Sequence, residues 1–119
     1  RRIVQIIGDG SFYFCTPLAV YAAAKQYELP IFTVVLDNSG WAAVKEATLR
    51  MYPDGAASAT RSYQSRLADR IELHKVAEAA GAYGETVEDP AALAGALERC
   101  MAALTAGRSA VLVARVTRL

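Results

Sequence analysis

Two short polar stretches, residues 8–11 (Gly-Asp-Gly-Ser) and 37–40 (Asp-Asn-Ser-Gly), hold the side chains best suited to bind a charged ligand. In the first, the glycines allow a ligand to approach the backbone closely. The backbone N–H groups of Gly10 and Ser11, just before a predicted helix, suit an anion. The Asp9 carboxylate would repel a phosphate unless a cation lay between them. This stretch therefore indicates a phosphate bound through a divalent metal.

The second stretch offers oxygen ligands, namely the Asn38 side-chain amide and the Gly40 carbonyl. Mg²⁺ prefers near-octahedral oxygen ligation and often joins a few protein oxygens to ligand phosphates. Asp9, Asn38 and the Gly40 carbonyl, with two phosphate oxygens and a water, would complete such a shell. The open alternative is that Asp9 and Asn38 are ordinary turn residues.

Hydrophobic periodicity and turn residues predict alternating strands and helices around these stretches. We expect a buried strand over 3–7 and strands over 31–36, 82–87 and 109–116. We expect a largely buried helix over 17–27, capped by Thr16, and helices over 42–51, 72–80 (ended by Gly81) and 90–106 (capped by Asp89, ended by Gly107). Residues 52–70 should form a long loop with one helical turn.

This alternation predicts an α/β fold, a doubly wound and mostly parallel sheet with helices on both faces. Ligands of open α/β sheets bind beyond the carboxyl ends of the strands. If the strands over 3–7 and 31–36 are neighbours, the two polar stretches lie on one rim of the sheet.

The composition fits one globular domain without a strong charge bias. The chain has 119 residues, 54% of them hydrophobic, and a formal net charge of +1, which argues against nucleic-acid and membrane binding. Cys15 and Cys100 are isolated, so we expect buried thiols in a reducing, cytoplasmic compartment rather than disulfides or zinc ligands. Because the chain opens with Arg1-Arg2 and not with Met, we expect an N-terminally truncated piece of a longer polypeptide.

Gly8-Asp9-Gly10-Ser11-Phe12, with Asn38 following Asp9 by 29 positions, resembles a thiamine diphosphate motif. Residues 73–82 (LHKVAEAAGA) are similar to a segment that follows in the same domains. The chain resembles the C-terminal, diphosphate-binding domain of the acetolactate synthase and 2-oxo-acid decarboxylase superfamily, over nearly its whole length.

This resemblance implies a thiamine diphosphate-binding fold with thiamine diphosphate and Mg²⁺ as cofactors. Asp9, Asn38 and the Gly40 carbonyl would hold the metal. Gly8, Gly10 and Ser11 would lie at the cofactor diphosphate. Trp41 either walls the pocket or is a partly buried loop aromatic.

The resemblance also implies an enzyme, a lyase or transferase acting on 2-oxo acids by decarboxylation or carboligation, and a homo-oligomer with the cofactor between subunits. The activating glutamate would lie in an N-terminal pyrimidine-binding domain of the partner subunit. We therefore assign no catalytic residue here and expect the isolated chain to be inactive. Some decarboxylases carry a glutamate where this chain has Val44, and an apolar residue there looks more like the ligases and synthases.

Two other functions stay open. One is a non-catalytic domain that binds phosphate or metal, and the other is a dinucleotide-binding domain, which is disfavoured because Tyr13 stands where the third fingerprint glycine belongs. For Glu46 and His74 we prefer solvated or structural roles. The arginines of residues 50–70 either close over an anionic ligand or are solvated.

Overall fold

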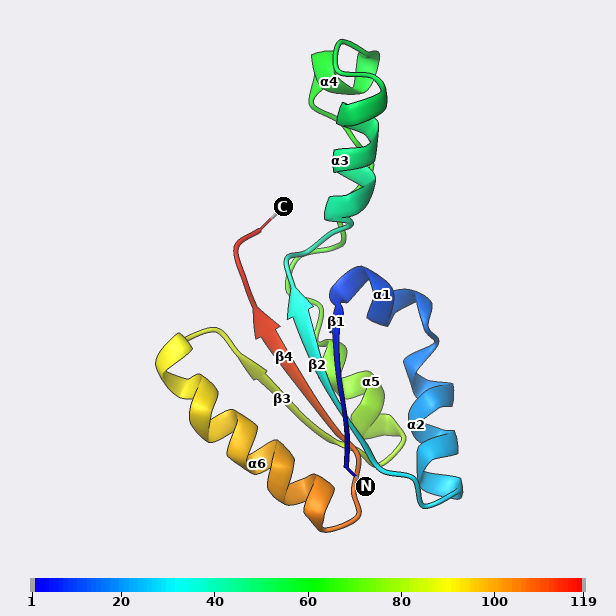
Figure 1. Cartoon of the computed structure of the whole chain (residues 1–119), viewed down its shortest axis with the longest axis vertical. Helices are drawn as coiled ribbons and strands as arrows, with labels where there is room; N and C mark the ends of the chain where they lie inside the picture. Colours follow the sequence, from blue (N-terminus) through cyan, green and yellow to red (C-terminus); the bar gives the residue numbers. More distant parts are fainter. Residues whose placement is uncertain (1, 119) are drawn as a thin grey trace.

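The computed structural model describes residues 2–118 and contains one parallel sheet in the order β1-β2-β4-β3. Its strands are β1 (Ile3–Gly8), β2 (Ile31–Asp37), β3 (Tyr83–Val87) and β4 (Ala110–Arg115). All three strand pairs are parallel, so the four carboxyl ends point to the same edge (Figure 1). The α/β fold expected from the sequence is confirmed.

The helices follow the predicted order, with one addition. They are α1 (Asp9–Phe14), α2 (Pro17–Gln26), α3 (Ala42–Met51), α4 (Ala56–Thr60), α5 (Leu73–Ala79), the 3₁₀ turn η1 (Pro90–Ala92) and α6 (Leu93–Thr105). The addition is α1, because residues 9–11 begin a helix instead of forming the expected loop.

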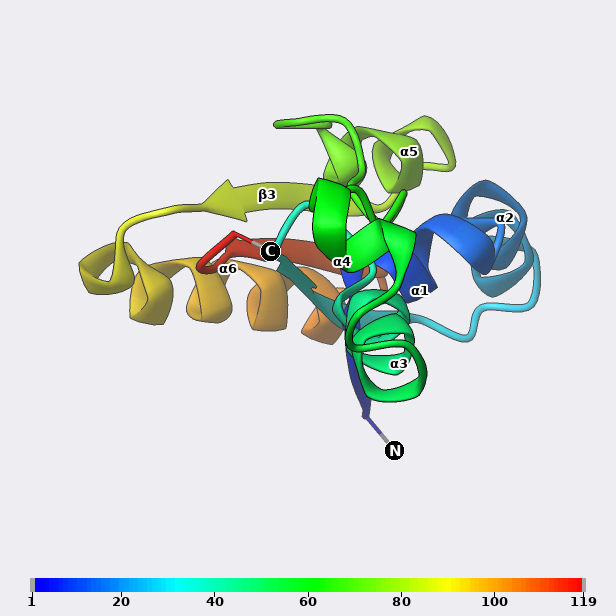
Figure 2. The ribbon, with the colours of Figure 1, turned by 90° about the horizontal axis from the view of Figure 1, so that it is seen from above.

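Helices cover both faces of the sheet, and each face has its own core. One core packs Phe12, Tyr21, Leu73 and Ala77 of α1, α2 and α5 against Val35 and its neighbours in the sheet. The other packs α6 against Phe32, Leu112 and Ala110. Viewed from above, α6 lies on one side of the sheet and α5 on the other (Figure 2). This two-sided cover explains why β4 is apolar and buried over its first four residues.

The residues predicted to begin or end helices can be checked against the backbone hydrogen bonds at the helix ends. Gly81 has φ +89°, its N–H donates to the Glu78 carbonyl, and the Ala82 N–H donates to the Ala77 carbonyl. These are the two hydrogen bonds of a Schellman motif, so the predicted end of the helix is confirmed. The Asp89 carboxylate accepts a hydrogen bond from the Ala91 N–H at 2.9 Å and caps the next helix as expected. Thr16 has φ +53° and makes no side-chain cap, so that cap was predicted wrongly.

Two predictions of burial are also wrong. In β1, Ile3, Val4 and Ile6 are 57%, 52% and 67% exposed, because β1 is the edge strand of the described sheet and α6 packs mainly against β2, β3 and β4. Helix α2 buries only Tyr21. Alternation and composition predicted the elements correctly, but they do not tell an edge position from a central one.

Helices α3 and α4 form an arm that extends beyond the carboxyl edge of the sheet (Figure 1). Neither helix has a buried residue. The chain returns to the sheet through an isolated antiparallel bridge between Gly40 and Arg66. Residues 52–70 thus contain the one short helix expected of them. No helix within residues 2–118 has the length and apolar character needed to cross a membrane.

Candidate functional site

The two polar stretches meet because β1 and β2 are neighbours. Ile7 pairs with Val35 and Gly8 with Leu36, so both strands end at the same level. Helix α1 starts at Asp9 directly after β1, and α3 starts at Ala42 shortly after β2. The expected common rim is confirmed.

The Asp9 carboxylate lies at the centre of this rim and is 2% exposed. Its Oδ1 accepts a hydrogen bond from the Gly10 N–H at 2.8 Å, within its own helix turn. Its Oδ2 accepts one from the Gly40 N–H at 2.9 Å, across the gap between the two stretches. Asp9 therefore joins the two stretches directly, and the Gly10 N–H, expected to face an anion, faces this carboxylate.

The Asn38 side chain reaches the same point. Its Oδ1 accepts a hydrogen bond from the Gly40 N–H at 3.2 Å, so that one N–H group serves both Asp9 and Asn38. Because they share one donor, the two side-chain oxygens converge on the same part of the site. Each of these oxygens also has a second lone pair, so the existing bonds leave room for metal coordination.

Burial makes the site favourable for a cation. Removal from water raises the pKa of Asp9, and the neighbouring Asp37 carboxyl adds to the increase. Asp37 is itself only 7% exposed, and its nearest cation is Arg115, whose Nε lies 3.8 Å from Asp37 Oδ2. A divalent ion beside Asp9 would offset the cost of burying these charges.

A metal here would need several kinds of ligand. Within residues 2–118, no three His, Cys, Asp or Glu side chains are grouped so as to hold an ion. An ion at Asp9 would therefore take its other ligands from the Asn38 amide, the Gly40 carbonyl and the oxygens of a bound molecule. Mg²⁺ accepts this mixed set of oxygens, so the donors present fit that metal.

Trp41 closes one side of the site against the glycine backbone. A Cβ atom built on Gly10 would lie 2.2 Å from Trp41 Cδ1, which shows how closely the indole ring covers this glycine. The ring also meets Phe14 at 5.5 Å and Tyr13 at 6.4 Å between centroids. Trp41 Nε1 is buried and has no hydrogen-bond partner among the described residues.

These residues enclose one cavity of about 390 Å³. Every residue expected from the sequence to bind a cofactor lines it: Gly8, Asp9, Gly10, Ser11, Asn38, Gly40 and Trp41. Apolar residues, among them Leu36 and Val44, complete the wall. The cavity therefore combines a buried acid, oxygen ligands and an apolar side, as a site for a metal and a phosphorylated heterocycle requires.

The comparisons with known proteins agree with this geometry. Residues 1–114 match the family "Thiamine pyrophosphate enzyme, C-terminal TPP binding domain". The chain belongs to this family. None of the curated proteins compared matches the chain significantly.

Two solved structures place this thiamine diphosphate-binding domain within larger proteins. One is the benzoylformate decarboxylase from Polynucleobacter necessarius, with 23% identity, a TM-score of 0.74, and 98% of this chain but 20% of that chain covered. The other is a protein from Mycobacterium smegmatis, provisionally described as a thiamin diphosphate-dependent enzyme, with 28% identity, a TM-score of 0.67, and 100% of this chain but 18% of that chain covered. The chain thus spans about one fifth of the length of these proteins.

The side chains that we did not assign to the domain's site lie elsewhere. His74 Nδ1 lies 2.9 Å from Thr86 Oγ1 and 3.4 Å from the Glu72 carboxylate, which is a structural role, as expected. Glu46 is exposed on α3. Cys15, predicted to be buried, is exposed, because α1 ends at Phe14 and nothing in the described chain covers the turn after it.

The sequence analysis did not predict that Arg115 lies near the site, and it gave Asp37 no role there. The Asp37 carboxylate caps its own turn by accepting the Ser39 N–H at 2.9 Å, and Arg115 pairs with it from the end of β4. The position of Asp37 at a strand end was a visible signal. Arg115 was not predictable, because its contact depends on β2 and β4 being neighbours.

Proposed function

We propose that residues 1–119 form the cofactor-binding C-terminal domain of a longer, acetolactate synthase-like enzyme that acts on 2-oxo acids. The domain would bind thiamine diphosphate through Mg²⁺. The observation that supports this most is the shared Gly40 N–H, which draws Asp9 Oδ2 and Asn38 Oδ1 together at the edge of one cavity.

Each residue would have a separate task in that site. Asp9, Asn38 and the Gly40 carbonyl would hold Mg²⁺, which neutralises the buried carboxylate and the cofactor diphosphate. Gly8, where a Cβ would meet no atom within 4 Å, would let the diphosphate approach the backbone, Gly10 leaves room for the Trp41 ring beside the site, and Ser11 adds polar groups at the start of α1. The cofactor itself supplies the carbanion chemistry, while the domain supplies position and electrostatics.

The reaction class is proposed from two facts about the site and its relatives. The chain resembles in fold a benzoylformate decarboxylase, an enzyme of a 2-oxo acid. Val44 lines the cavity, where a decarboxylase proton relay would need an acid or base, which favours carboligation over simple decarboxylation. No side chain of this cavity is assigned to activate the cofactor. We therefore propose that a pyrimidine-binding domain of a partner subunit activates it, in a homo-oligomer. We also propose that the enzyme is cytoplasmic.

Isothermal titration of the chain with thiamine diphosphate, with and without Mg²⁺, tests this proposal. We expect binding that requires Mg²⁺ and that falls at least tenfold in Asp9→Ala, because a charge-assisted ligand is worth roughly 1.5–3 kcal/mol. Asp54→Ala is the matched control, because Asp54 is an exposed acid outside the cavity. Circular dichroism of each variant separates lost binding from lost folding.

Two results would contradict the proposal. The metal site would be wrong if binding were equally tight without Mg²⁺ and in the Asp9→Ala variant. The division of labour between subunits would be wrong if the isolated chain turned over a 2-oxo acid.

A further inference from the structure

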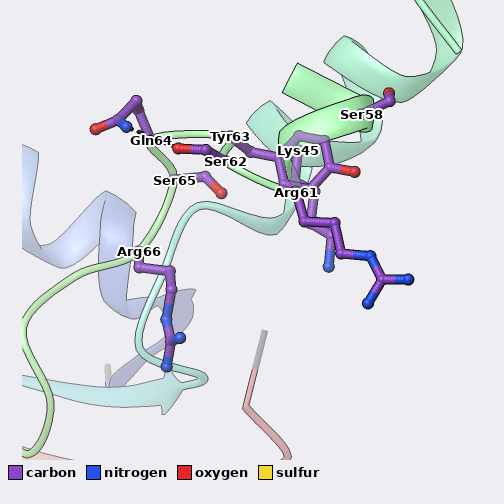
Figure 3. Close-up of a pocket in the computed structure, with 8 residues that line it drawn as sticks. All are labelled: Lys45, Ser58, Arg61, Ser62, Tyr63, Gln64, Ser65 and Arg66. Atoms are coloured by element: carbon purple, nitrogen blue, oxygen red, sulfur yellow. Dashed lines mark hydrogen bonds between the residues drawn. The ribbon is translucent and has the colours of Figure 1, made fainter. Parts of the chain in front are cut away.

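A second cavity, of about 580 Å³, lies in the arm and not at the cofactor site (Figure 3). It is formed where the loop after α4 passes α3. Its lining includes Lys45, Arg61, Ser62, Tyr63, Ser65 and Arg66. It shares no lining residue with the cavity at Asp9, so the two are separate.

The lining of this cavity is cationic. It contains Lys45, Arg61 and Arg66 and no acidic side chain. Within residues 2–118, none of the three forms an ion pair, whereas the other arginines near this rim, such as Arg70 and Arg115, pair with glutamates. All three line the same cavity, with Arg66 farther along the loop than Arg61 (Figure 3). Cations that line one cavity without carboxylates repel one another, and a bound anion would relieve that repulsion.

The volume of the arm cavity and its uncharged lining residues indicate which class of ligand would fit. Lys45 Nζ lies 5.6 Å from the centroid of the Tyr63 ring, which keeps the ammonium group at the cavity wall. Ser62 and Ser65 add hydrogen-bonding groups. A volume of this size suits a small metabolite and far exceeds the need of a lone phosphate ion.

We propose that this arm pocket binds a phosphorylated metabolite of nucleotide size that carries at least two negative charges. The site is distinct from the thiamine diphosphate site and does not depend on the function proposed above. Backbone contacts link the two sites: the Trp41 N–H donates to the Ser65 carbonyl at 2.7 Å, and Gly40 forms an antiparallel bridge with Arg66.

Isothermal titration of the chain with ADP as the probe tests the proposal, with adenosine as its uncharged counterpart. We expect ADP to bind and adenosine not to bind. Because the pocket is open to solvent, ADP binding should weaken as salt is raised. Lys45→Met and Arg66→Gln should each weaken ADP binding roughly tenfold, the effect of one charge-assisted hydrogen bond.

Arg50→Gln is the matched control, because Arg50 lies on α3 like Lys45 but does not line the pocket. It should leave ADP binding unchanged. The proposal is overturned if ADP does not bind at millimolar concentration, or if adenosine binds as tightly as ADP. It is also overturned if Arg50→Gln weakens ADP binding as much as Arg66→Gln, or if thiamine diphosphate competes with ADP for a site that Asp9→Ala abolishes.

Discussion

The contact between Gly10 and Trp41 allows a sharp test of how the cofactor site is packed. In the Gly10→Ala variant, the new methyl group would lie 2.2 Å from Trp41 Cδ1 and 2.4 Å from Trp41 Nε1. Neither distance is tolerable for carbon, so the indole ring would have to move. Its contacts with Phe14 and Tyr13 would then be lost or altered.

The expected magnitude combines two opposing effects. Forcing a side chain into a packed site costs about 1–3 kcal/mol. Gly10 lies in the first turn of α1, where alanine is favoured over glycine by at most about 1 kcal/mol. We therefore expect Gly10→Ala to destabilise the fold by up to about 2 kcal/mol, or roughly 4 °C in melting temperature for each kcal/mol in a domain of this size.

The assay is a double-mutant cycle measured by urea unfolding. If the clash with the ring is the cause, Gly10→Ala in a Trp41→Ala background should not destabilise, and the helix preference of alanine should show as a gain. The coupling between the two sites should then be about 1–3 kcal/mol. Gly8→Ala is the control, because a Cβ on Gly8 would meet no atom within 4 Å. The reasoning is refuted if Gly10→Ala costs the same with and without the Trp41 ring.

Three other predictions concern groups outside the cofactor site. Burial raises the pKa of Tyr21 to about 12, and its hydroxyl donates to Thr33 Oγ1 at 2.7 Å. The folded state therefore holds this proton more tightly than the unfolded state, so stability should fall as pH rises from about 10 to 12 in the parent and less in Tyr21→Phe, measured by urea unfolding. The hydrogen bond from Arg99 lowers the pKa of Glu85, so Glu85→Gln should reduce the melting temperature at neutral pH. The difference should shrink as the pH falls through the lowered pKa of Glu85 and the carboxylate becomes protonated in the folded state. Asp89→Ala removes a helix cap and should cost about 1 kcal/mol in urea unfolding, and an unchanged midpoint would contradict the cap.

The sequence predicted most elements because turn residues mark their ends. Gly81 and Asp89 fixed the ends of two helices through specific backbone bonds. The pairing of Asp9 with Asn38 was also predictable, because carboxyl ends of neighbouring parallel strands share one edge.

What the sequence could not predict depends on contacts between distant segments. Arg115 meets Asp37 only because β4 lies beside β2. The arm pocket exists only because the chain after α4 folds back along α3. The exposure of Ile6 follows from the place of β1 in the sheet, which local patterns do not encode.

The position of β1 has a practical consequence for anyone who handles this molecule in concentrated solution. Among the described strands it pairs with β2 alone. Its Ile-Val-Gln-Ile-Ile sequence has neither a charged residue nor a proline that would oppose pairing with a strand of another molecule. An exposed edge strand of this kind can pair with a strand of another molecule and so extend β-structure between molecules. In solutions of residues 1–119 alone, we therefore expect this edge to seed fibril formation, and Ile6→Lys should slow the growth of fibrils.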